Sequence, residues 1–98
     1  MAFKAMFTEL ALRRLELYLQ KAQDKKDLID KMRNVLSRIG SDPKIGKIRK
    51  YGVMKDRGYF EYIVDDYKII YRIDDQRSKI LIVAIIYAPL RPLPSQSN

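Results

Sequence analysis

Apolar and polar residues alternate along some parts of this chain and follow a helical repeat along others. Residues 2–7 alternate Phe3, Ala5 and Phe7 with Lys4 and Met6, and Thr8 follows them. This pattern predicts a short strand that ends at a helix cap. Residues 9–22 then carry apolar residues at helical spacing on one side and charged residues on the other, which predicts an amphipathic helix.

A second helical repeat follows Asp24, which is placed to cap a new helix. Its apolar stripe consists of Leu28, Met32, Val35, Leu36 and Ile39. Gly40 is predicted to end the helix at a C-cap position, before Ser41, Asp42 and Pro43. Because the connection between the two helices is short, they are expected to form an antiparallel hairpin. The stripe is needed for the core, and any part left exposed is a candidate surface for a partner.

The second half of the chain has the composition of strands. Residues 44–58 mix basic residues with three glycines, which predicts a loop or an irregular edge strand. Residues 59–64, 67–73 and 80–88 are rich in Tyr, Ile and Val and are separated by short polar turns, which predicts an antiparallel meander. The last of these strands is apolar on both faces and is therefore expected to lie centrally in the sheet.

These elements predict an α+β fold, in which an N-terminal strand and an antiparallel helical hairpin pack on a twisted, mainly antiparallel sheet. With 98 residues, of which 47% are hydrophobic, the chain is expected to form one domain over residues 1–98. Residues 92–98 are predicted to be a loose tail.

The charge balance favours an acidic or polyanionic partner. The chain has 20 Lys and Arg residues against 12 Asp and Glu, a net charge of +8, although any single lysine can simply be solvated. Cysteine and histidine are both absent, which excludes thiolate zinc sites and Cys–His or Ser–His catalysis. Paired aspartates lie at predicted turns, so no metal or cofactor is expected. No apolar run is long enough for a membrane span, and a cytoplasmic location is expected.

Three segments carry a resemblance to a known superfamily. They are residues 7–11 (FTELA) opening the first helix, residues 42–46 (DPKIG) after the second, and residues 67–73 (YKIIYRI) in the middle strand. Their order resembles that of the RelE/ParE toxins of bacterial type II toxin–antitoxin systems. The resemblance implies the same architecture that the periodicity predicts. It also implies a cognate antitoxin that wraps and neutralises the toxin in a heteromeric complex, and a chain of this charge suits an acidic partner that folds on binding.

The superfamily contains two kinds of toxin. Relatives similar to RelE enter the ribosomal A site and cut mRNA, whereas relatives similar to ParE bind DNA gyrase and stabilise its cleaved complex without being enzymes. The resemblance implies candidate site residues for the first activity. Lys68 occupies a position where relatives commonly have arginine, and Arg72 follows on the same face of the middle strand. Both are candidates for binding phosphates and for neutralising charge in the transition state.

Further candidates come from the two ends of the sheet. Lys47, Arg49 and Lys50 lie in a basic segment that contributes lysines in mRNA-cutting relatives, and a solvated charge run is the alternative. Tyr87 stands where many relatives have histidine, and Arg91 stands near a position where relatives have arginine. A phenol with a pKa of about 10 is a poor base unless its site lowers that pKa, so packing is the alternative for Tyr87.

Three functional hypotheses remain. The first, which the missing histidine favours slightly, is a ParE-like toxin that inhibits DNA gyrase by binding it. The second is a RelE-like, ribosome-dependent mRNA endonuclease that uses the basic strand face. The third is a nontoxic nucleic-acid-binding module that shares the fold, because a fold alone does not determine function.

Overall fold

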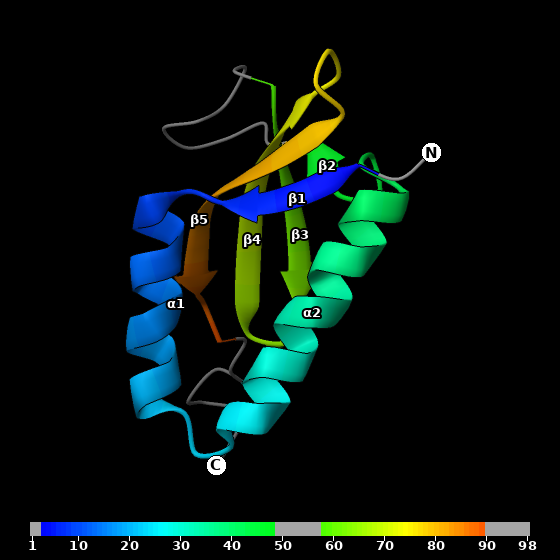
Figure 1. Ribbon diagram of the computed structural model, residues 1–98. Helices are drawn as coiled ribbons and strands as arrows, with labels where there is room; N and C mark the ends of the chain where they lie inside the picture. The colour runs from blue at the N-terminus through cyan, green and yellow to red at the C-terminus, as the bar shows by residue number, and fades with distance from the viewer. Residues whose placement is uncertain (1–2, 49–57, 90–98) are drawn as a thin grey trace.

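The structure is a computed structural model that describes residues 3–48 and 58–89. Its elements in chain order are β1 (Lys4–Phe7), α1 (Glu9–Lys21), α2 (Lys25–Ser41), β2 (Lys47–Ile48), β3 (Tyr59–Val64), β4 (Tyr67–Asp74) and β5 (Lys79–Tyr87) (Figure 1). Each helix begins at the cap that the sequence predicts. The Thr8 hydroxyl accepts a hydrogen bond from the Ala11 N–H, and the Asp24 carboxylate accepts one from the Asp27 N–H.

The strands form one mixed sheet in the order β1-β5-β4-β3-β2. β3, β4 and β5 make the predicted antiparallel meander, and β1 pairs with β5 in parallel. β5 therefore lies between β1 and β4, which confirms its predicted central position. β3 and β4 are joined by the two residues Asp65 and Asp66, and Asp65 has the positive φ of 50° that tight hairpin loops require.

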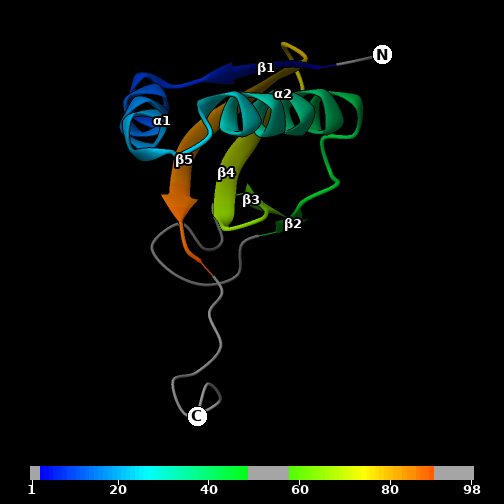
Figure 2. The ribbon, with the colours of Figure 1, turned by 90° about the horizontal axis from the view of Figure 1, so that it is seen from below.

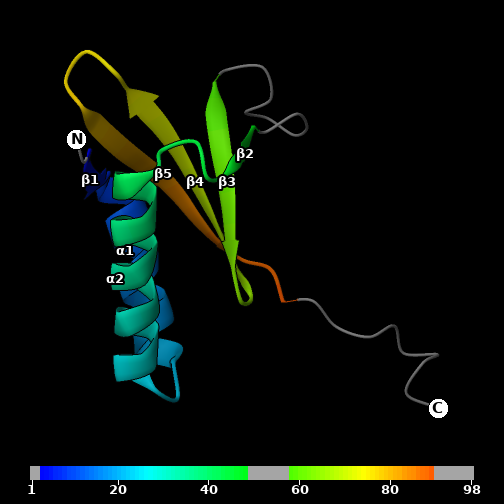
Figure 3. The same cartoon turned by 90° about the vertical axis from the view of Figure 1, so that its right-hand side faces the viewer.

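Both helices lie on one side of the sheet, as Figures 2 and 3 show from two directions. The core lies between these two layers, where apolar side chains from α1, α2, β4 and β5 meet. Its buried members are Ala11, Leu15, Leu28, Met32, Val35, Ile39, Ile69, Tyr71, Ile80, Ile82 and Ile85. The apolar stripe of the second helix thus packs in the core, and its partly exposed member Leu36 packs against it. The α+β architecture predicted from periodicity is confirmed.

The predicted role of Gly40 as a C-cap is wrong. α2 continues through Gly40 to Ser41, and Asp42 is the capping residue, with its N–H bonded to the Arg38 carbonyl. Gly40 instead contacts Phe3, the residue before β1: the Gly40 carbonyl accepts a hydrogen bond from the Phe3 N–H at 2.8 Å, and a Cβ on Gly40 would lie 2.8 Å from the Phe3 carbonyl oxygen. Glycine is needed here because the backbone of Phe3 approaches the helix closely.

The segment after α2 agrees in part with its prediction. Within it, residues 47–48 form an edge strand of two residues, β2, which pairs with β3. Residues 49–57 and the predicted tail at 92–98 lie outside the described residues. Among the residues described, neither helix is long and apolar enough to cross a membrane.

Candidate functional site

Three of the predicted basic residues lie on the face of the sheet opposite the helices. In β4, Ile69 and Tyr71 point into the core, so Lys68 and Arg72 point to the other side. β2 and β3 place Lys47 directly opposite Glu61, and opposed residues in antiparallel strands share a face. We call the set Lys47, Glu61, Lys68 and Arg72 the helix-free face. The structure therefore brings together Lys47, Lys68 and Arg72, which belong to two different strands.

Glu61 is the member of this face that the sequence analysis did not single out. Its side chain is 9% exposed, and its Oε1 lies 3.9 Å from the Lys68 Nζ. A charged group that is nearly buried needs compensating partners, and Lys68 is one of them. The alternation of residues along β3 indicates the face on which Glu61 lies. Phe60, Tyr62 and Val64 pack against the core, so Glu61 points to the opposite face with Lys68.

At one end of the helix-free face, Arg72 lies near a second carboxylate. Asp74 accepts a hydrogen bond from the Arg77 N–H at 3.3 Å and forms an ion pair with the Arg77 guanidinium at 3.2 Å. Partial loss of solvent opposes ionisation of Asp74, but these two contacts and the positive charges of Arg77 and Arg72 outweigh it and lower its pKa. The positive charge of Arg72 is thus partly balanced by a neighbour on its own strand.

Tyr87 lies on the other side of the sheet. It pairs with Tyr67 at the end of β5, and the two ring centroids are 5.3 Å apart. The Tyr87 N–H donates to the hydroxyl of Tyr18 in α1, and that hydroxyl donates to the Ile85 carbonyl. Burial, together with the neighbouring phenol of Tyr87, raises the pKa of Tyr67. Tyr87 therefore belongs to a cluster of phenols on the helix side and is separated from Lys68 and Arg72 by the sheet.

A bulge in β5 explains where Tyr87 points. Tyr71 pairs with Ile82 and Ile70 pairs with Ala84, so Val83 is an extra residue in β5. Ile80 and Ile82 point into the core before the bulge, and Ile85 does so after it. One inserted residue reverses the alternation of every residue that follows. The bulge thus turns Tyr87 to the helix side, whereas unbroken alternation from Ile80 would point it toward the helix-free face.

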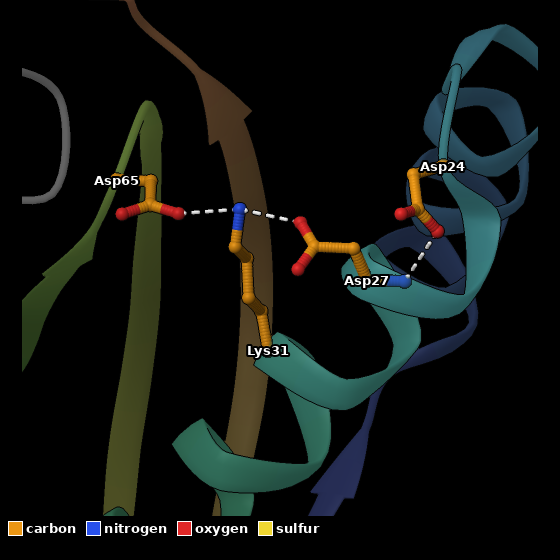
Figure 4. A network of polar contacts seen from close by, with 4 residues as sticks. All are labelled: Asp24, Asp27, Lys31 and Asp65. Atoms are coloured by element: carbon orange, nitrogen blue, oxygen red, sulfur yellow. Dashed lines mark hydrogen bonds and ion pairs between the residues drawn. The ribbon is translucent and has the colours of Figure 1, made fainter.

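The tyrosine cluster borders a cavity of about 750 Å³ between the tip of the helical hairpin and the β3–β4 turn. Lys31 closes one side of this cavity, because its ammonium contacts Asp27 on its own helix at 2.7 Å and Asp65 in the turn at 2.5 Å (Figure 4). The hydrogen bonds to Asp27 and Asp65 raise the pKa of Lys31, so it stays charged at all physiological pH values. This ion pair links α2 to the sheet.

The other predicted site residues, Arg49, Lys50 and Arg91, lie outside the described residues. Within residues 3–48 and 58–89, no group of three Asp, Glu, His or Cys side chains is arranged to hold a metal ion. The described part of the candidate site is thus a face with three cations and the Glu61 carboxylate, and Asp74 adds a second carboxylate at one end. Such a face can bind phosphates or an acidic protein surface.

Residues 6–88 match the family described as the ParE toxin of the type II toxin–antitoxin system, parDE. The chain belongs to this family. The match to the ParE toxin family runs from β1 to the end of β5 and so includes every described residue of the helix-free face. Among curated proteins, none matches the sequence significantly.

Solved structures show the same fold for this ParE-family chain. The RelBE2 toxin–antitoxin complex of Mycobacterium tuberculosis matches with a TM-score of 0.71 and 20% identity, over 89% of this chain and 99% of the other. The isolated Escherichia coli RelE toxin matches with a TM-score of 0.69 and 15% identity, over 98% and 95%. The E. coli RelBE complex matches with a TM-score of 0.63 and 14% identity, over 93% and 100%. These likenesses place the chain in the RelE/ParE superfamily fold.

Proposed function

We propose that this ParE-family toxin arrests bacterial growth by binding DNA gyrase and that a cognate antitoxin neutralises it. The separation of Tyr87 from the basic residues is the observation that supports gyrase as the target. Tyr87 stands where many relatives have a histidine, and its phenol lies among tyrosines on the opposite side of the sheet from Lys68 and Arg72. A proton-transfer group must come within hydrogen-bonding reach of the reacting atoms. This arrangement favours binding over catalysis.

Two observations support an antitoxin as the partner. Two of the structures similar to this chain are toxin–antitoxin complexes. The chain also carries a net charge of +8, which favours association with an acidic partner.

Ribosome-dependent cleavage of mRNA is the second candidate, and the composition of the helix-free face favours it. Lys47, Lys68 and Arg72 can hold the phosphates on either side of a scissile bond. The Glu61 carboxylate, 3.9 Å from the Lys68 ammonium, is the group on this face that could accept the proton of an attacking 2′-hydroxyl. Under this hypothesis, catalysis would use Glu61 in place of the missing histidine.

Two assays on the purified toxin distinguish these candidates. The first measures cleaved DNA trapped on gyrase, and the second uses primer extension to detect cuts in mRNA that is being translated. The gyrase proposal predicts trapped DNA cleavage and intact mRNA. New cuts in the ribosomal A site, with gyrase unaffected, would instead establish the endonuclease.

A pair of double variants tests whether the helix-free face is responsible. Lys68→Ala with Arg72→Ala removes two charges from that face, and Lys25→Ala with Lys26→Ala removes two charges from the exposed start of α2. The first pair should abolish whichever activity is found, and the second should leave it intact. If expression of the wild-type chain causes no growth arrest, the nontoxic binding module becomes the better explanation.

A further inference from the structure

The cavity at the tip of the helical hairpin has an aromatic wall built from three separate elements. Tyr18 of α1, Tyr67 of β4 and Tyr87 of β5 all line it, and their ring centroids are between 5.3 and 6.2 Å apart. The Tyr18 ring is fixed by two hydrogen bonds of its hydroxyl, one to the Ile85 carbonyl and one from the Tyr87 N–H. Tyr87 is 49% exposed, so part of the wall is accessible. At about 750 Å³, the cavity has the size of a small-molecule site.

The charge of this cavity is opposite to that of the whole chain. Four aspartates and two lysines line it, which gives the lining a net charge of −2, whereas the chain carries +8. Asp24 and Asp27 come from the start of α2, and Asp65 and Asp66 come from the β3–β4 turn. A cation is therefore attracted to this cavity, although the molecule as a whole repels cations. The tyrosine rings add to this preference, because the face of an aromatic ring attracts a cation.

The cavity already holds one ammonium group, that of Lys31. This group lies between the carboxylates of Asp27 and Asp65, at 2.7 and 2.5 Å, so the wall of the cavity is suited to binding an ammonium (Figure 4). Two carboxylates remain for a ligand. Asp24 uses one oxygen to accept the Asp27 N–H and so caps α2. In the part of the chain that the structure describes, the Asp66 side chain has no hydrogen-bonding or ion-pair partner.

The two remaining carboxylates belong to different layers of the fold, because Asp24 lies in the helical hairpin and Asp66 in the sheet. A ligand that reaches both needs two cationic groups, and an apolar chain between them can lie on the tyrosine rings. Among the described residues, no three acidic side chains are arranged to hold a metal ion, which favours an extended cation over a compact one. We propose that the cavity binds a linear aliphatic polyamine. One ammonium binds Asp24, a second binds Asp66, and the methylene chain lies on Tyr67 and Tyr87.

Two aspartates in strand turns provide a matched test. Asp66 lies in the β3–β4 turn and lines the cavity, whereas Asp75 lies in the β4–β5 turn, outside it. Replacing either by Asn removes one charge and keeps the shape of the side chain. Calorimetry measures the affinity of the wild type and of each variant for spermidine, and thermal melting of each free variant checks that it is folded. Asp66→Asn should weaken binding about tenfold, and Asp75→Asn should change it less than about twofold.

Two further cations show which property of the ligand the cavity recognises. Butylammonium has one ammonium on a chain like that of a lysine side chain, and Mg²⁺ has charge without a chain. Both should bind the wild type at least about tenfold more weakly than spermidine, because neither can reach both carboxylates and cover the rings. If spermidine does not bind the wild type, or binds Asp66→Asn and Asp75→Asn equally, the site is overturned. Butylammonium or Mg²⁺ binding as tightly as spermidine would also overturn a polyamine site, in favour of a single ammonium group or of charge alone.

Discussion

The hydroxyl of Tyr71 in β4 accepts a hydrogen bond from the backbone N–H of Gly46 at 3.0 Å. The same hydroxyl donates to the Pro43 carbonyl at 2.7 Å, so one fully buried phenol holds both ends of the segment between α2 and β2. This contact connects two motifs that the sequence analysis could only place in order along the chain. It also positions β2, and with it Lys47 of the helix-free face.

Replacing Tyr71 by Phe should lower the free energy of unfolding by about 1–3 kcal/mol, because the Pro43 carbonyl and the Gly46 N–H lose their partner. Urea denaturation of the wild type and the variant measures this difference. The exposed Tyr87 serves as the control, and Tyr87→Phe should cost less than about 0.5 kcal/mol. Equal costs for both variants would show that the Tyr71 hydrogen bonds contribute little to stability.

Stability should fall at alkaline pH. Burial raises the pKa of Tyr71 above its ordinary value of 10.0, although the hydrogen bond from Gly46 opposes this rise. Because the pKa of Tyr71 is higher in the folded state than in the unfolded state, it contributes stability at pH values below the unfolded-state pKa. This stability is lost as the pH rises from the unfolded-state pKa through the folded-state pKa. Unfolding by urea at about pH 8 and about pH 11 measures the loss. The loss should be smaller in Tyr71→Phe but not abolished, because burial also raises the pKa of Tyr67.

Gly46 should not tolerate even alanine. A Cβ at this position would lie 2.6 Å from the Tyr71 hydroxyl and 2.8 Å from the Glu61 carbonyl oxygen, so we expect a loss of about 1–3 kcal/mol. Tyr71→Phe removes one of these two collisions. The double variant should therefore lose less stability than the sum of the single variants, and a double-mutant cycle measures the difference. Strict additivity would mean that the two residues are not coupled.

Gly40→Ala should destabilise the protein even though alanine is the better helix former. Helix propensity favours alanine by about 1 kcal/mol. The new methyl group would lie 2.8 Å from the Phe3 carbonyl oxygen, and displacing the backbone of Phe3, which is bonded to Gly40 and leads directly into β1, costs about 1–3 kcal/mol. We expect a net loss of about 1 kcal/mol in chemical denaturation. Asn34→Ala, at an exposed site on the same helix, should instead raise stability slightly. A gain at both positions would mean that β1 shifts freely.

Lys68→Ala should reduce stability more than Arg72→Ala. A loss of toxicity in Lys68→Ala must therefore be compared with its loss of stability. The Lys68 ammonium compensates the nearly buried Glu61 carboxylate, whereas Arg72 is exposed. We expect a loss of about 1–2 kcal/mol for Lys68→Ala, between the values for exposed and buried ion pairs. Adding Glu61→Gln removes the carboxylate charge that Lys68 balances and should restore most of this stability. Thermal melting of Lys68→Ala, Arg72→Ala and the Lys68→Ala, Glu61→Gln double variant tests this order of stabilities. A Lys68→Ala protein as stable as Arg72→Ala would contradict a stabilising ion pair between Lys68 and Glu61.

The amino-acid sequence by itself determined the order of strands and helices, their capping residues Thr8 and Asp24, and the sharing of one strand face by Lys68 and Arg72. These features depend on spacing along the chain, which alternation and the helical repeat report directly. The parallel pairing of β1 with β5, the contact between Gly40 and Phe3, and the approach of Glu61 to Lys68 were decided by the tertiary structure, because each joins separate elements. The side on which Tyr87 lies was decided in the same way. One extra residue at Val83 reverses the alternation of β5, and local periodicity does not reveal a bulge that forms only when β5 pairs with β4.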